Sequence, residues 1–155
     1  MADPRDPAPP VARPAATSDD SRVWVDRAGP QHYIGHNGRG PSIPIGMAGA
    51  EGCHSPTELL RIALAGCAGL SAEHVLTRRL GEGADIRIAV TGEHDATGRR
   101  FTELTSTLTL DLSGLAPQAQ EQLRTVVTRA VHRYCTVGRT LEQGAPVPIA
   151  FRGRA

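Results

Sequence analysis

Apolar residues gather in three short stretches between residues 22 and 45. Their β-branched and aromatic residues are typical of strands, which we place at residues 22–25, 31–35 and 42–45. The Gly-Pro pair at residues 29–30 and the Gly-rich run at 37–41 separate these stretches as turns. The pattern predicts an antiparallel meander, followed by a Gly/Ala-rich loop over residues 46–54.

The strongest local signal is a helix that begins after Ser55 and ends near residue 81. Ser55 can cap it, Pro56 suits its first turn, and Glu58 stands three residues after the cap, as in a capping box. Apolar residues then recur at helical spacing. They are Leu59, Leu60, Ala63, Leu64, Cys67, Leu70 and Leu76.

The middle of this helix carries small side chains around Cys67. Gly66 and Gly69 each cost about 1 kcal/mol relative to alanine in a helix interior. Their presence therefore indicates either close approach of another backbone or access to the Cys67 sulfur.

Alternating apolar residues over 85–97 and 101–112 predict a second antiparallel pair of strands, joined as a hairpin. A second helix is predicted from Pro117 to about Tyr134, with one or two further turns over residues 137–143. A final strand is predicted over Val147 to Phe151. The order βββ–α–ββ–α–β indicates an α+β fold with a long central helix.

The length of 155 residues suits one domain, which we place at residues 21–155. Residues 1–20 hold five of the 12 prolines and few apolar side chains, so we expect a disordered tail there. Aromatic residues make up only 3% of the chain, so Ala, Val and Leu must fill the core. Burial against a second subunit would help such a core.

Charge and cysteine content exclude several classes of protein. The 17 basic and 16 acidic residues are interspersed, which argues against a nucleic-acid partner. No long apolar stretch or secretory signal is recognisable, so we expect a cytoplasmic protein without a membrane span. Three cysteines without a Cys-x-x-Cys pair indicate neither a disulfide scaffold nor a zinc ribbon.

Two of the cysteines stand at informative positions. Cys67 lies in the middle of the long helix, and Cys135 follows the second helix in Tyr134-Cys135-Thr136-Val137. Free cysteines inside cells are most often small buried hydrophobic residues. Only the tertiary fold could bring these two together.

The residues around both cysteines resemble those of the OsmC/Ohr family. The first match is His54-Ser55-Pro56-Thr57-Glu58-Leu59-Leu60, followed by Ala63-Leu64-Ala65-Gly66-Cys67. The second is the Cys-Thr-Val run at Cys135, ahead of a short turn and a last strand. The likeness extends over about residues 23–151.

The resemblance implies an intertwined homodimer that reduces organic hydroperoxides in the response to oxidative stress. Cys67 would become a sulfenic acid and then form a disulfide with Cys135. A lipoyl-type or other small dithiol would reduce that disulfide, and no cofactor or metal is implied. Apolar walls from Leu60, Leu64 and Val131 would favour bulky hydroperoxides.

The resemblance also implies an arginine from the N-terminal strand region and a glutamate immediately after the proline, which would support the thiolate. These two residues map less directly onto this chain. The residue after Pro56 is Thr57, and the acid follows one position later as Glu58, about 100° further around the helix. Three arginines could support the thiolate, namely Arg27, Arg39 and Arg139, and position in the chain favours Arg27. The displaced acid puts efficient peroxidase activity in question.

Other functions remain open at this point. The displaced acid also fits a non-enzymatic binding protein of the same fold, with an apolar ligand pocket at the dimer interface. A metal site built from Cys53, His54, Cys67, His132 and Cys135 lacks recognisable ligand spacing. Cys53 lies outside both motifs and is expected to be an incidental thiol.

Overall fold

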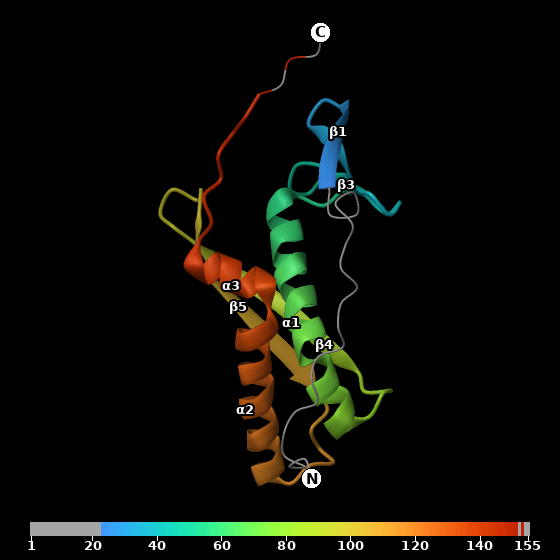
Figure 1. Cartoon of the computed structure of the whole chain (residues 1–155), viewed down its shortest axis with the longest axis vertical. Helices are drawn as coiled ribbons and strands as arrows, with labels where there is room; N and C mark the ends of the chain where they lie inside the picture. The colour runs from blue at the N-terminus through green and yellow to red at the C-terminus, as the bar shows by residue number, and fades with distance from the viewer. Residues whose placement is uncertain (1–22, 152, 154–155) are drawn as a thin grey trace, which may run out of the picture. The chain divides into compact units, whose positions relative to one another are not determined.

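A computed structural model describes residues 23–151 and 153, and the predicted tail of residues 1–20 lies outside them. The chain forms three helices and two small antiparallel sheets, so the predicted α+β class is confirmed (Figure 1). It divides into two compact units, the first ending at Pro56 and the second beginning at Thr57.

The first unit is the predicted meander, with strands β1 (Val23–Gly29), β2 (His32–Asn37) and β3 (Ser42–Ile45) in that order. Gln31 adopts a φ of 54° in the turn between β1 and β2, next to the predicted Gly-Pro pair. The loop after β3 returns to the sheet at His54. Its N–H donates to the carbonyl of Pro44 at 3.0 Å, and its carbonyl accepts from Gly46 at 3.0 Å.

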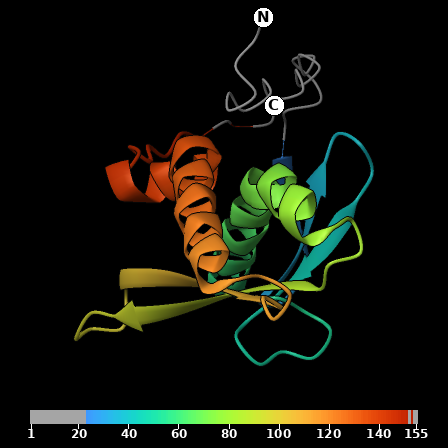
Figure 2. The ribbon, with the colours of Figure 1, turned by 90° about the horizontal axis from the view of Figure 1, so that it is seen from below.

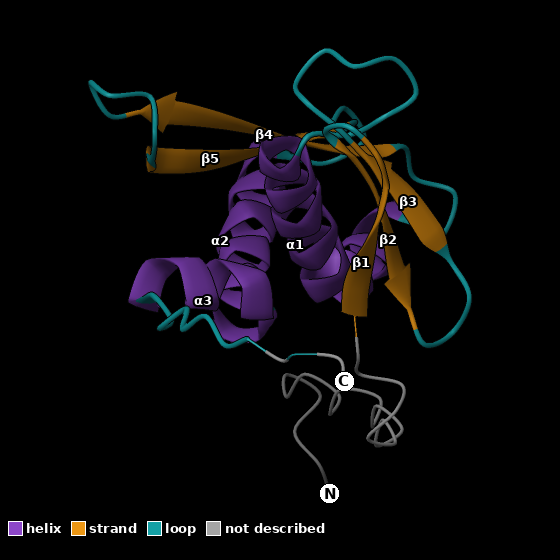
Figure 3. Cartoon of the chain, turned by 90° about the horizontal axis from the view of Figure 1, so that it is seen from above, coloured by secondary structure: helices purple, strands orange, loops and turns teal. Residues whose placement is uncertain are grey.

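The second unit packs helices on one face of a hairpin (Figure 2). Helix α1 (Pro56–Leu80) precedes strands β4 (Ile86–His94) and β5 (Phe101–Leu110), and helices α2 (Pro117–Tyr134) and α3 (Thr136–Gln143) follow. These bounds confirm the two predicted helices, the hairpin and the further turns. Helix α3 leaves the end of α2 in a new direction (Figures 1 and 3).

The core of this unit lies where α1 and α2 meet the hairpin. Ala72 and Leu76 of α1 are buried against Leu123 and Val127 of α2, because both helices repeat apolar residues every three or four positions. Side chains of β4 and β5 complete it, including Ile86, Leu108 and Leu110.

The two helix glycines have different surroundings. A Cβ on Gly69 would lie 3.1 Å from the Ile88 Cδ1 atom of β4, so Gly69 allows close packing of the hairpin on α1. A Cβ on Gly66 would meet no atom within 4 Å in the described part of the chain. The close neighbour of Gly69 is thus a side chain rather than the backbone that the sequence suggested.

The predicted last strand is wrong for this structure. Residues 147–151 are described and form no strand, and Val147, Ile149 and Phe151 are 82–94% exposed. Alternating apolar residues give a segment the pattern of a strand, but its backbone must also pair with the edge of a sheet. Among the described residues, no sheet edge pairs with this segment.

Helix α1 also corrects the expectation that nothing in the chain resembles a membrane span. Its most apolar 18 residues have a mean hydropathy of 1.4, so by length and composition alone the helix could cross a membrane. Core helices of soluble proteins have the same composition. The four buried positions of α1 form one stripe, at Leu64, Ala68, Ala72 and Leu76, as in a helix packed on a core.

Candidate functional site

Cys67 and Cys135 lie together in the second unit. Cys67 is half-buried in the middle of α1, and Cys135 is buried at the junction of α2 and α3. Their side chains are hydrogen-bonded to each other, and both cysteines are free thiols. The fold therefore places two thiols within reach of each other from distant parts of the chain.

A break in the helical backbone positions Cys135. Its ψ of 97° is extended, so α2 ends there while its N–H still donates to the carbonyl of Val131 at 2.8 Å. The same residue caps α3, because its Sγ accepts the N–H of Gly138 at 3.3 Å. The first N–H groups of α3 consequently lie beside both sulfur atoms.

Those N–H groups favour ionisation of Cys67. Burial raises the pKa of its thiol, but four hydrogen bonds lower it. They come from the backbone N–H of Val137, the Cys135 side chain, the backbone N–H of Thr136 and the Ser71 hydroxyl. Together they outweigh burial, so the pKa of Cys67 lies below its usual value.

Cys135 shifts in the opposite direction. Burial raises the pKa of its thiol, and the hydrogen bond and charge of Cys67 raise it further, against the N–H groups of Gly138 and Val137. When two thiols interact in this way, the first proton leaves one and the second is held more tightly. The pair therefore favours a Cys67 thiolate beside a protonated Cys135.

A cavity of about 710 Å³ lies beside the pair, between α1, β5, α2 and α3. Leu60, Leu64 and Val131 line it, the residues that the sequence suggested as apolar walls. Cys135 is one of the described residues that line the cavity, and Cys67 is not. The cavity therefore leads to the second thiol of the pair rather than to the first.

The hydrogen bonds to Cys67 predict a pH profile. Alkylation of Cys67 by iodoacetamide should remain fast at pH values below those of an ordinary thiol and decline only as the pH falls through its lowered pKa. Ser71→Ala should move the midpoint of this profile upward, because the Ser71 hydroxyl, which donates to the Cys67 carbonyl at 2.7 Å, is also one of the groups that lower the pKa of Cys67. Mass spectrometry of the Cys67 peptide at each pH measures the rate.

Thr77→Ala is the matched control for this profile. The Thr77 hydroxyl donates to the carbonyl of Glu73 at 3.0 Å, as the Ser71 hydroxyl donates to the carbonyl of Cys67 at 2.7 Å, but further along α1. The pH midpoint of Cys67 alkylation in Thr77→Ala should equal that of the wild type. Equal midpoints for Ser71→Ala and Thr77→Ala would show that the Ser71 hydroxyl does not lower the pKa of Cys67.

Comparison with known proteins shows the family of this chain. The sequence pattern of the family described as OsmC-like protein matches residues 49–150, which include both cysteines. The chain belongs to the OsmC-like family. The resemblance noted in the sequence is thereby confirmed.

Relatives of this OsmC-like chain include the uncharacterized proteins Rv2923c of Mycobacterium tuberculosis and Mb2948c of Mycobacterium bovis. Each is 41% identical over 127 residues, which cover 82% of this chain and 93% of the relative. Their similarity extends the family relation to most of the chain.

Solved structures share the fold. A hypothetical protein from Aquifex aeolicus has a TM-score of 0.60 and 21% identity, over 79% of this chain and 86% of that one. A protein from Psychrobacter arcticus, described as an osmotic stress induced and detoxification response protein, has a TM-score of 0.58 and 20% identity, over 76% and 85%.

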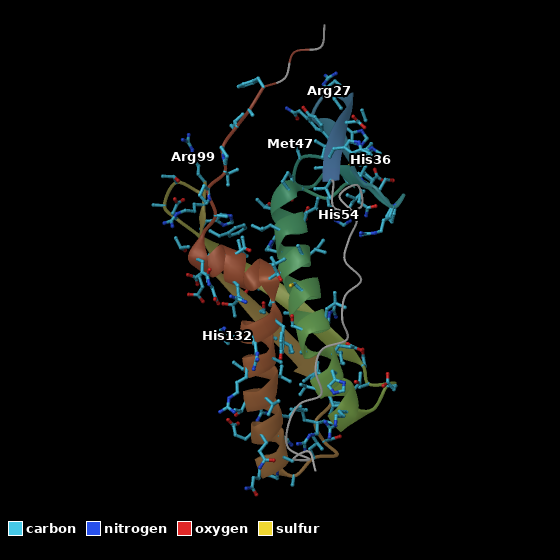
Figure 4. All side chains as sticks on the ribbon, viewed as in Figure 1. Arg27, His36, Met47, His54, Arg99 and His132 are labelled. Carbon is cyan, nitrogen blue, oxygen red and sulfur yellow. The ribbon has the colours of Figure 1, made fainter. Side chains whose placement is uncertain are left out.

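The predicted arginines lie in different places in the OsmC-like chain. Arg27 (Figure 4) lies on β1 opposite Tyr33. Arg39 lies in the turn after β2, and both arginines belong to the first unit. Arg139 lies on α3 and lines the cavity. Within residues 57–151, no arginine is among the groups that lower the pKa of Cys67.

The remaining candidates are distributed as follows. Glu58 lies in the first turn of α1, where the helix dipole favours a carboxylate. Cys53 lies in the first unit beside Gly46. His132 lies on α2 (Figure 4) and is 3.7 Å from Glu142. No cluster of three or more metal-ligating side chains occurs among the residues that the structure describes.

Sequence reasoning missed the donors to Cys67. Ser71 stands four residues after Cys67, which places it one turn away on the same face of a helix, so spacing alone could have identified it. The N–H groups of Thr136 and Val137 carry no side-chain signal. The change of backbone direction at Cys135 determines where they point.

Proposed function

We propose that this protein is a thiol-dependent peroxidase that reduces organic hydroperoxides through Cys67 and Cys135. One observation carries the proposal, namely a Cys67 thiol of lowered pKa that is hydrogen-bonded to a second thiol. A thiolate is the attacking species in peroxide reduction, and a neighbouring thiol can trap the oxidised product. Membership of the OsmC-like family supports it.

The reaction would proceed in two steps at these sulfur atoms. The Cys67 thiolate attacks the distal oxygen of the hydroperoxide, an S–O bond forms, the O–O bond breaks, and the alkoxide takes a proton to leave as an alcohol. Cys135 then loses its proton and attacks the Cys67 sulfenic acid, so that water leaves and a disulfide forms. An external dithiol supplies the two electrons that restore the thiols.

A role in stress response is part of this proposal. The Psychrobacter arcticus protein of similar fold is described as an osmotic stress induced and detoxification response protein. Arg27 as a cation near the thiolate, Glu58 as its orienting partner, and a cytoplasmic location are predictions that belong to the same proposal.

Thiol titration tests the proposal. The reduced protein is mixed with one equivalent of cumene hydroperoxide, and free thiols are counted before and after. Rapid loss of two thiols per chain, with the third retained, is expected. Unchanged thiol content, with Cys67→Ser behaving like the wild type, would instead favour a non-enzymatic binding protein.

A homodimer is also proposed, on the basis of an exposed apolar stripe on α1. Ile62 and Leu70 are 52% and 77% exposed, and Gly66 lies between them. Single exposed apolar residues are ordinary, but a stripe on one helix face is typical of an interface. A second copy would cover the stripe, and the small residues would permit close contact of the two helices.

Leu70→Glu should break this dimer, because a charge would be buried without a partner. Sedimentation velocity should show a dimer for the wild type and mostly monomer for Leu70→Glu. Leu141→Glu, on α3 outside the stripe, is the control and should remain dimeric. A monomeric wild type would contradict the proposed interface.

A further inference from the structure

Phe101 of β5 contributes a phenyl ring to the wall of the cavity, and neighbours from two other elements fix the position of that ring. The His94 ring of β4 lies 4.3 Å from the Phe101 ring, centroid to centroid, at an interplanar angle of 35°. The Arg61 guanidinium of α1 lies over the same ring, 5.9 Å from its centroid, as a cation–π neighbour. The phenyl ring is therefore held between the hairpin and α1.

Gly92 of β4 makes room for this ring. A Cβ built on Gly92 would lie 2.6 Å from the Phe101 Cδ1 and Cε1 atoms and 2.9 Å from the Leu104 Cδ2 atom. A glycine inside a strand often marks the close approach of another group. Gly92 lies on the same side of β4 as Ile88, whose Cδ1 atom faces Gly69 of α1. The Phe101 ring thus lies on the side of the hairpin that the helices cover (Figure 2).

The ring stands at one end of the apolar part of the cavity. The lining residue that precedes Phe101 along the chain is Arg100, which is exposed. Leu60 is the first residue of α1 among the described residues of the wall, and it is next to the arginine that covers the ring. The side chains of Phe101 and Leu60 therefore mark the same end of the apolar wall.

The apolar wall leads from this end to the thiol pair. Leu64 follows Leu60 by one helical turn, and both line the cavity. A Cβ built on Gly138 would lie 3.6 Å from the Leu64 Cδ1 atom and 3.2 Å from the Cys135 Sγ atom, so Leu64 and this sulfur are close neighbours. The Cys135 side chain is in turn hydrogen-bonded to Cys67. An organic group that lies along this wall is therefore bounded by the thiol pair and by the phenyl ring.

We propose that Phe101 is a specificity-determining residue, whose ring closes this end of the cavity and limits the length of the organic group that the site accepts. The inference rests on the proposed peroxidase function and adds which hydroperoxides are preferred. Compact organic groups, such as the cumyl group, fit between the thiol pair and the ring. A long linear chain meets the ring before its oxygen atoms reach the thiols.

A series of alkylating disulfide-forming reagents tests this limit without any peroxide. An n-alkyl methanethiosulfonate transfers its S-alkyl group to a thiolate, so that an S–S bond forms and methanesulfinate leaves. The loss of the free Cys67 thiol in the reduced protein is measured by peptide mass spectrometry for reagents from methyl to decyl. In the wild type, the rate should fall for the longest chains. A rate that does not fall up to the decyl reagent would overturn the length limit.

Phe101→Ala removes the ring and should extend the site. The decyl rate, divided by the methyl rate, should rise by at least about tenfold, as is usual when methylene groups gain a place in an apolar pocket. Phe151→Ala is the matched control, because Phe151 is the other phenylalanine of the chain and is 94% exposed. Its profile of rate against chain length should equal that of the wild type.

Gly92→Ala should have the opposite effect, although position 92 is not among the described residues of the cavity wall. The new Cβ would push the Phe101 ring and the Leu104 side chain toward the helices, so the rate should fall at shorter chains. Gly83→Ala is the control, since a Cβ there would meet no atom within 4 Å in the described part of the chain.

Circular dichroism verifies that each variant is folded. If Gly92→Ala does not fold, Phe101→Ala decides alone. A folded Phe101→Ala protein with the wild-type profile would overturn the proposal.

Hydroperoxides of different length connect the ring to the proposed reaction. The kcat/KM for dodecyl hydroperoxide, divided by that for cumene hydroperoxide, should rise by at least about tenfold in Phe101→Ala. If neither hydroperoxide is reduced but the thiosulfonate series shows the length limit, the peroxidase proposal fails alone. If both are reduced and the ratio is the same in the wild type and in Phe101→Ala, the role of Phe101 fails alone.

Discussion

Replacing Cys67 by serine is expected to lower the rate of hydroperoxide reduction by about 1,000-fold or more, because the attacking sulfur is lost. Serine has nearly the same size as cysteine, and the helix around position 67 already tolerates small side chains. The fold should therefore persist. Hydroperoxide consumption in the presence of excess dihydrolipoic acid measures the effect.

Cys53→Ser is the matched control for Cys67→Ser. Cys53 lies in the first unit, outside the hydrogen-bonded pair. Its replacement should leave the rate within about twofold of the wild type, because neither step of the proposed reaction uses its thiol. A Cys67→Ser protein that still consumed hydroperoxide at the wild-type rate would show that another group reacts.

Replacing Cys135 by serine is expected to have a different signature. The first reaction at Cys67 should still occur, because three of its four hydrogen-bond donors remain. Steady-state turnover should fall by about 100-fold, since no disulfide forms and the sulfenic acid is open to further oxidation. Stopped-flow kinetics of the first turnover, together with steady-state rates, separates the two effects.

Mass spectrometry completes the test of Cys135→Ser. After excess hydroperoxide, the Cys67 peptide should carry sulfinic or sulfonic acid in this variant and be recovered as a disulfide in the wild type. If the wild type gave the same over-oxidised peptide, Cys135 would have no protecting role and the two-thiol mechanism would be wrong.

Most secondary structure could be predicted because its causes are local. The capping residues at Ser55 to Glu58 and the helical repeat of apolar residues predicted α1, and alternation predicted the hairpin. The prediction of a last strand was wrong because strand pairing is not local. Its pattern at Val147 to Phe151 is local, whereas pairing needs a sheet edge that the described residues of one chain do not provide.

The candidate site divides in the same way. The motifs indicated Cys67 and Cys135 through their resemblance to a family, but no feature of the sequence gave the relative position of the two sulfur atoms. To support the Cys67 thiolate, the sequence suggested charged side chains, namely arginines and a glutamate. Within the second unit, backbone N–H groups and the Ser71 hydroxyl lower the pKa of Cys67.

The sequence by itself determined the elements, their order and the family, because capping, periodicity and short motifs depend on residues close together along the chain. Only the tertiary structure decided that two distant thiols meet at the start of α3, and that a cavity ends at Cys135 rather than Cys67. Both results depend on where the backbone turns at Cys135 and on how α1 packs beside α2. Such packing joins residues that are remote in sequence, so no local pattern encodes it.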